Sequence, residues 1–262
     1  MKSIQPHTHE QRTAIVEQLI PLFHTKFGDN LLAIAATASY ARGTDLDYSD
    51  LELTVFLREP LEGEKDPYLQ RIVDGLLIEV EYLTPDVYFQ RFKDLKDYWG
   101  IPGSDPLVGI YNVDFIKELC AKVAAIRHTP TQYRRAAARK QPEVQEAFAK
   151  VFNAISEDNR EGIGVLFFDA VLILLHMLAL LNGKPFTTLS RYIAEARNFK
   201  IKPDRLDEML NILVEGDYAN LRRLKNVMTD VYESLERIFA GYKLPFGDAS
   251  FDPNIPNKIP HR

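Results

Sequence analysis

The sequence predicts an α+β protein in which a mixed β-sheet with helices is followed by an all-helical bundle. Two observations carry this prediction. Short apolar runs with strand-like alternation recur between residues 31 and 111, and no further run of this kind follows residue 112. From Asp114 to Ala240 the apolar residues recur at helical spacing instead, in one segment after another.

Composition excludes several classes of protein. The chain has 262 residues, of which 46% are hydrophobic and 26% charged, so it is neither a disordered tail, a collagen-like chain nor a coiled-coil rod. A net charge of −5 argues against a dedicated nucleic-acid binder. The single cysteine, Cys120, excludes an internal disulfide and a cysteine-based zinc site. With no secretory signal pattern in residues 1–10, these features favour the cytoplasm.

The first half begins with a predicted amphipathic helix over residues 9–27, which Thr8 caps and Gly28 ends. Apolar runs then predict four strands, over residues 31–37, 51–57, 76–83 and 107–111. A helix is expected to begin at Thr84-Pro85-Asp86, because proline is favoured in the first turn of a helix.

The second half reads as helices alone. Helical patterns cover residues 114–128, 131–156, 163–181, 188–198, 203–214 and 218–240. The boundary between the halves falls near Thr129-Pro130. We therefore expect a sheet domain over residues 1–128, a helical domain over 129–244 and an extended, proline-rich tail over 245–262.

One segment, residues 165–181, is almost wholly apolar. A membrane-spanning helix needs about 20 such residues. This run is shorter and contains Asp169 and His176. We therefore expect a helix that is buried on all sides in the bundle, and no membrane partner.

The chemistry of the sequence is concentrated between residues 38 and 53. Asp50 and Glu52 are two apart on a predicted strand, so both carboxylates point to the same face. Just upstream, a strand ends and a turn of small residues opens a predicted helix near Ser39, where backbone N–H groups and a hydroxyl can bind phosphate. Arg42 follows in the first turn, placed to face an anion. Hard oxygen ligands beside a phosphate-binding turn are what Mg²⁺-dependent phosphoryl or nucleotidyl transfer needs.

A second carboxylate pair, Glu79 and Glu81, lies on one face of the strand predicted over residues 76–83. If this strand pairs with the strand of Asp50, a third carboxylate joins the site. The alternative reading of both pairs is the solvated face of an edge strand.

These residues carry a resemblance to a known family. The pattern resembles the signature of polymerase-beta-like nucleotidyltransferases, and within them most closely kanamycin nucleotidyltransferase and its relatives. The matching positions are Ser39-x-x-Arg42-x-Thr44-Asp45-x-x-Tyr48-Ser49-Asp50-x-Glu52. The family motif begins Gly-Ser, whereas this chain has Ala38-Ser39, which adds a methyl group where the family's backbone approaches phosphate.

The resemblance implies roles for further residues. It selects Glu79 rather than its neighbour two residues on as the third carboxylate, and it adds Thr44 and Ser49 to the nucleotide-binding residues. In the helical half, a Glu-x-x-x-Lys segment resembles the family's: Glu146 would be the general base on the acceptor hydroxyl, and Lys150 would contact the triphosphate. If this last pair has no function, it is an ordinary surface ion pair between residues one helical turn apart.

The function that the resemblance implies is Mg²⁺-dependent transfer of a nucleoside monophosphate from ATP, or another nucleoside triphosphate, to a hydroxyl of a small molecule. Asp50 and Glu52 would hold the metal. An aminoglycoside acceptor, and hence antibiotic resistance, is expected first, and a homodimer with a shared active site is implied. Two alternatives stay open: another acceptor such as a lincosamide, and a non-catalytic binding or regulatory protein with the same fold.

Overall fold

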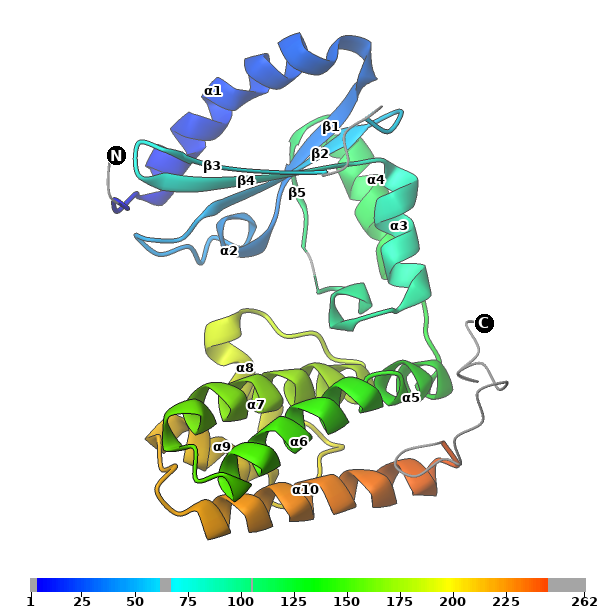
Figure 1. Ribbon diagram of the computed structural model, residues 1–262. Helices are drawn as coiled ribbons and strands as arrows, with labels where there is room; N and C mark the ends of the chain where they lie inside the picture. The colour runs from blue at the N-terminus through cyan, green and yellow to red at the C-terminus, as the bar shows by residue number, and fades with distance from the viewer. Residues whose placement is uncertain (1–3, 62–66, 105, 245–262) are drawn as a thin grey trace. The chain divides into compact units, whose positions relative to one another are not determined.

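A computed structural model describes residues 4–61, 67–104 and 106–244. The chain divides into two compact units. The first comprises residues 1–94 and 102–127, and the second comprises residues 95–101 and 128–262 (Figure 1). A mixed sheet with helices makes up the first unit and helices make up the second, which confirms the predicted α+β class. The predicted tail, residues 245–262, lies outside the described residues.

The first unit is built on a five-stranded mixed sheet in the order β3-β4-β2-β1-β5. The strands are β1 (Leu31–Ala36), β2 (Leu51–Leu57), β3 (Tyr68–Val73), β4 (Leu76–Leu83) and β5 (Val108–Tyr111). β2 and β4 run parallel, and every other neighbouring pair is antiparallel. The four strands predicted from the sequence are therefore present within a residue or two of their expected bounds.

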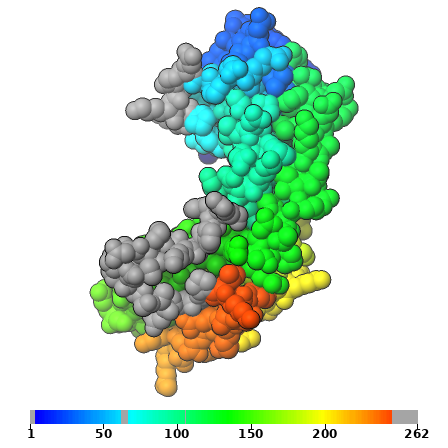
Figure 2. Space-filling model, turned by 90° about the vertical axis from the view of Figure 1, so that its right-hand side faces the viewer, coloured from blue at the N-terminus to red at the C-terminus, as the bar shows by residue number. Residues whose placement is uncertain are grey.

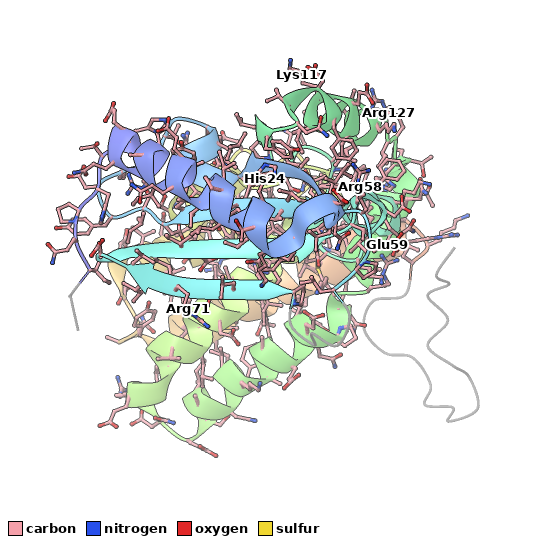
Figure 3. The ribbon with its side chains drawn as sticks, turned by 90° about the horizontal axis from the view of Figure 1, so that it is seen from above. His24, Arg58, Glu59, Arg71, Lys117 and Arg127 are labelled. Carbon is pink, nitrogen blue, oxygen red and sulfur yellow. The ribbon has the colours of Figure 1, made fainter. Side chains whose placement is uncertain are left out.

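Helices cover both faces of this sheet. Val16 and Phe23 of α1 (His9–Phe27) pack against one face, where they belong to the same buried cluster as the leucines of β2. Tyr88 of α3 (Pro85–Asp94) and Ile116 of α4 (Val113–Ala124) pack against the other. Figure 3 shows α1 lying across the sheet when the molecule is seen from above.

The start of α1 is fixed by its first residues. The Thr8 hydroxyl accepts a hydrogen bond from the Gln11 backbone N–H, and the Gln11 side chain accepts one from the Thr8 backbone N–H. This capping box satisfies two donors that a helix start otherwise leaves unpaired. Gly28 ends the helix at a φ of 49°, so both predicted ends are confirmed.

Strand β3 was not predicted from the sequence. It forms a hairpin with β4, and the turn between them is Asp74-Gly75, with φ values of 49° and 88°. Two consecutive positive φ values fit a type I′ turn, which Asp-Gly favours. β3 is an edge strand whose side chains are mostly exposed, so it lacks the alternating hydrophobicity that reveals the other strands.

The second unit is a helical bundle with one continuous apolar core. Its helices are α5 (Pro130–Ala138), α6 (Gln141–Ser156), α7 (Arg160–Asn182), α8 (Tyr192–Ala196), α9 (Leu206–Glu215) and α10 (Leu221–Gly241). Leu95, Tyr98 and Ile101, from the short segment before β5, belong to the same core. Figure 2 shows α10 in orange on one face of this unit.

The single helix expected over residues 131–156 is wrong, because the structure has α5 and α6 there. Pro142 lies in the first turn of α6. Proline lacks a backbone N–H and its ring clashes with the carbonyl of the preceding turn, so an interior proline kinks or breaks a helix and is best tolerated in a first turn. The chain turns at Arg139 and Lys140 instead, and a new helix begins.

Helix α7 is the one helix in the described part of the chain that is long and apolar enough to span a membrane, judged by length and composition. However, 56% of its most apolar window is buried inside the protein. The expectation that it is buried on all sides is wrong near its start, where Val165 is 73% exposed and Phe168 48% exposed. Further along, residues such as Leu174 and Leu178 are fully buried and form the centre of the bundle.

Candidate active site

A cluster of three carboxylates lies at one end of the parallel strand pair. Glu52 of β2 and Glu79 of β4 are direct partners in the strand register, and Asp50 immediately precedes β2. One carboxylate oxygen from each of these residues lies within 4.8 Å of the other two, and all three residues are partly buried. The strands of Glu52 and Glu79 therefore pair, as a third carboxylate in the site requires.

The strand periodicity sets where these carboxylates point. Leu51 and Leu53 pack on the α1 side of the sheet, so Glu52 between them points to the opposite face. Glu79 alternates in the same way with Ile78 and Val80. The two strands therefore deliver their carboxylates side by side on the face that α3 and α4 partly cover.

Glu79 is held by a residue that the sequence did not single out. Gln70 of β3 is the register partner of Glu79, and its amide Nε2 donates a hydrogen bond of 2.7 Å to Glu79 Oε1. Burial and the nearby Asp50 carboxylate raise the pKa of Glu79, and the bond from Gln70 offsets part of that rise. A cluster that destabilises its own negative charge favours a bound cation.

Glu81 has a different environment from Glu79. Its carboxylate forms an ion pair of 2.6 Å with Arg91 of α3 and accepts a hydrogen bond of 2.9 Å from the Tyr68 hydroxyl. It is not part of the three-carboxylate cluster. Of the two glutamates on β4, Glu79 is the one placed to contact a metal ion.

Ser39 lies in α2 (Ala38–Ala41), a single helical turn directly after β1. Ala38 has a φ of 53°, in the left-handed region that costs an L-residue roughly 1–2 kcal/mol. The turn thus adopts a backbone conformation that suits glycine, although alanine occupies the position. The strain is stored at the residue where the family motif has glycine.

The remaining predicted nucleotide-binding residues of this unit follow α2. Arg42 is the C-cap of α2 and is partly buried. The Thr44 backbone N–H donates to the Ser39 carbonyl at 3.0 Å, and the Ser49 hydroxyl accepts from the Leu46 backbone N–H at 2.9 Å. Both residues shape the chain between the α2 turn and the carboxylates.

Glu146 and Lys150 belong to the helical unit, on α6. They form an ion pair of 2.8 Å one helical turn apart, with side chains 68% and 52% exposed. The hydrogen bond and charge of Lys150 lower the pKa of Glu146. The ion pair therefore keeps Glu146 ionised and makes it a weaker proton acceptor than a free glutamate.

A family model matches the helical half of the chain. Residues 116–243 match the family model of the KNTase C-terminal domain. The helical half is therefore similar to the KNTase C-terminal domain. This match covers α6 with its glutamate–lysine pair but not the carboxylates of the sheet, whose resemblance rests on the motif between residues 39 and 52.

A solved structure supports the fold of both halves of the chain. A nucleotidyltransferase-like protein from Exiguobacterium sibiricum 255-15 aligns over 87% of this chain and 77% of its own, with a TM-score of 0.51. The two sequences are 12% identical, so the likeness establishes the fold alone. No curated protein matches the chain.

The donor set fits a small, hard divalent cation. Mg²⁺ prefers carboxylate oxygens and is bound through a few of them, with water and phosphate oxygens completing its shell. The cluster offers three carboxylates, and the Gln70 amide orients one of them. Hydrogen bonds to ligand carboxylates are typical of metal sites in proteins.

Proposed function

We propose that the chain is a Mg²⁺-dependent nucleotidyltransferase that moves a nucleoside monophosphate from ATP, or another nucleoside triphosphate, to a hydroxyl of a small molecule. The observation that carries the proposal is the convergence of one carboxylate oxygen each from Asp50, Glu52 and Glu79 within 4.8 Å of one another. The loop of residues 42–49 joins α2 to Asp50. The KNTase C-terminal domain in the second half supports the same reaction class.

The sheet unit supplies the donor half of the site. Asp50 and Glu52 hold Mg²⁺, with Glu79 as the third carboxylate. The bound metal neutralises charge on the triphosphate and on the reacting phosphorus. Ser39 and Arg42 bind the triphosphate, and Thr44 and Ser49 keep the connecting chain in place.

The helical unit supplies the acceptor half. The acceptor oxygen forms a bond to the α-phosphorus, the bond from that phosphorus to the β-phosphate breaks, and pyrophosphate leaves. Glu146 takes the hydroxyl proton, and Lys150 contacts the triphosphate. The resemblance to kanamycin nucleotidyltransferase supports a homodimer in which Glu146 of one subunit serves the carboxylates of the other.

The acceptor is proposed by family likeness. An aminoglycoside is the first candidate, and such activity would confer antibiotic resistance; a lincosamide or another polyol is the second. The single cysteine and the use of a nucleoside triphosphate favour the cytoplasm. Ala38, strained at the position of the motif glycine, favours a second function: a binding or regulatory protein that keeps the fold without turnover.

Pyrophosphate release tests the proposal. The protein is incubated with Mg²⁺ and ATP, and then GTP, against a panel of aminoglycosides, lincosamides and other polyols, with Asp50→Asn as the control. Release that requires an acceptor, and that the control lacks, supports the enzyme and names its substrate class. Nucleotide binding without release on any acceptor of the panel points to an acceptor outside the panel, whereas loss of both release and nucleotide binding favours the non-catalytic alternative.

A further inference from the structure

Beneath the candidate site lies a buried ion pair that the proposed chemistry does not use. Arg12 of α1 is fully buried, and the side chain of Asp45 is 2% exposed. Arg12 Nη1 donates to Asp45 Oδ2 at 3.0 Å. Arginine is rarely buried to this extent unless all of its donors are satisfied, so the surroundings of this guanidinium define its role.

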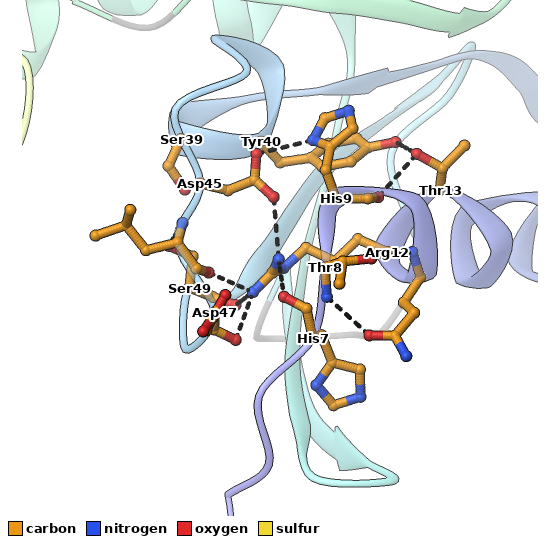
Figure 4. Close-up of polar contacts among 12 residues, drawn as sticks. His7, Thr8, His9, Arg12, Thr13, Ser39, Tyr40, Asp45, Asp47 and Ser49 are labelled. Carbon is orange, nitrogen blue, oxygen red and sulfur yellow. Dashed lines mark hydrogen bonds and ion pairs between the residues drawn. The ribbon is translucent and has the colours of Figure 1, made fainter.

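The guanidinium of Arg12 also binds backbone (Figure 4). Its nitrogens donate hydrogen bonds of 2.7 to 3.1 Å to carbonyl oxygens on two segments. The acceptors are the carbonyls of His7, Leu46, Asp47 and Ser49. Three of these four carbonyls belong to the loop that leads into Asp50. One of the three is the carbonyl of Ser49, the residue directly before Asp50.

The same end of α1 also holds the α2 turn. The hydroxyls of Thr13 and Tyr40 are hydrogen-bonded at 2.8 Å, and the His9 ring stacks on the Tyr40 ring with centroids 4.6 Å apart. His9 Nδ1 lies 2.8 Å from Asp45 Oδ1 and so connects this stack to the buried ion pair. The first turns of α1 thus contact both the α2 turn and the loop of residues 45–49 (Figure 4).

We propose that Arg12 is a positioning residue of the metal site: its buried guanidinium holds the loop of residues 45–49 so that Asp50 stands beside Glu52 and Glu79. Arg12 touches neither substrate nor metal in this assignment and acts through the loop backbone. The inference rests on the proposed function, since it assigns Arg12 a role at the same metal site.

Geometry explains why arginine is needed. A guanidinium presents five N–H donors in a planar fork, which matches one carboxylate and several carbonyls at once. Lysine keeps the positive charge but has a single nitrogen, so it cannot satisfy acceptors spread over two segments. Arg12→Lys should therefore leave Asp45 paired while releasing most of the loop carbonyls.

The experiment measures binding of Mn²⁺ alone to the full chain, by calorimetry without nucleotide. Four proteins are compared: wild type, Arg12→Lys, Asp45→Asn and Arg58→Lys. Arg58 is the matched control, because it lies at the opposite end of β2 and donates from Nε to a single carbonyl, that of Asp29 (Figure 3). Circular dichroism confirms at the working temperature that each protein is folded.

We expect Arg12→Lys and Asp45→Asn to weaken Mn²⁺ binding by about tenfold or more, the usual effect of losing a residue that orients metal ligands. Arg58→Lys should bind as wild type does. Wild-type affinity in folded Arg12→Lys would overturn the proposal, as would an equal loss in Arg58→Lys. If the wild type binds Mn²⁺ but transfers no nucleotide, the proposed function fails, while the comparison of Arg12→Lys with wild type still decides the role of Arg12.

Discussion

At the scale of single residues, the candidate site is a concentration of negative charge. Burial and Asp50 raise the pKa of Glu79 in the folded protein above the ordinary value of 4.5. The folded protein therefore holds this proton more tightly than the unfolded chain does. The resulting stability is fully present below a pH of about 4.5 and is lost as the pH rises through the folded-state pKa.

Glu79→Gln should consequently stabilise the metal-free protein near neutral pH. The gain should stay below about 1 kcal/mol, because Glu79 is only partly buried and solvent screens its charge. Urea unfolding in the presence of a chelator, near pH 4 and near pH 7, measures it. Glu81→Gln is the control and should show no gain, because Glu81 is paired with Arg91. A less stable Glu79→Gln at neutral pH would contradict this account of the cluster.

Ala38 provides a second test at this scale. Ala38→Gly removes left-handed strain of roughly 1–2 kcal/mol from the folded protein. It also raises the conformational entropy of the unfolded chain, which costs about 0.4–1 kcal/mol of stability. The variant should therefore be as stable as wild type or more stable, by up to about 1.6 kcal/mol. Ala41→Gly, at the end of the same turn, should instead lose roughly 0.5–1 kcal/mol. Urea unfolding compares the two, and a destabilised Ala38→Gly would show that the φ of 53° is not a source of strain.

The residues of the site differ in how far the sequence reveals them. Asp50, Glu52 and Ser39 stand in one short motif, so local periodicity is enough to bring them together. Gln70 and Arg12 cannot be found in this way. Gln70 meets Glu79 through a hairpin whose exposed strand carries no alternating pattern, and Arg12 meets Asp45 across 33 residues of chain.

At the scale of elements, the fold was predictable where one face of an element is buried. β1, β2 and β4 carry clear apolar runs because helices cover the sheet on both sides. The exposed edge strand β3 carries no such pattern, although its Asp74-Gly75 turn is a strong hairpin signal. The break between α5 and α6 was marked by Pro142, whose effect on the backbone outweighs the continuous apolar spacing.

Helix α7 gives a test of its own at this scale. Leu174 is fully buried in the bundle, so Leu174→Ala should lower the free energy of unfolding by about 2–5 kcal/mol. Val165, one part of the same helix but 73% exposed, is the matched control, and Val165→Ala should stay within roughly 0.5 kcal/mol of wild type. Thermal and urea unfolding measure both. Equal losses in the two variants would mean that α7 is buried on all sides after all.

At the scale of the whole molecule, the proposed chemistry is divided between two compact units. The metal-binding carboxylates belong to the sheet unit, and Glu146 with Lys150 belongs to the helical unit. A reaction that needs both sets of residues requires one unit to meet another, within one subunit or between two. In the proposed homodimer, the two units that meet belong to different subunits.

Mixing two inactive variants tests that choice. Asp50→Asn lacks a metal ligand and Glu146→Ala lacks the base, and Glu146→Ala should still bind nucleotide. In a mixed dimer with shared sites, one of the two sites combines an intact Asp50 with an intact Glu146. Random exchange of subunits should therefore restore about a quarter of wild-type activity. No recovery, with exchange verified by mass spectrometry, would place each site within one subunit.

The central claim is that the carboxylate cluster transfers a nucleotide to an acceptor hydroxyl. The most direct measurement uses ATP labelled at the α-phosphorus and follows the label with Mg²⁺ and an acceptor, in the wild type and in Asp50→Asn. The account predicts label on the acceptor with the wild type and none with a folded Asp50→Asn. Equal labelling by both proteins would contradict it, because transfer would then not depend on the cluster.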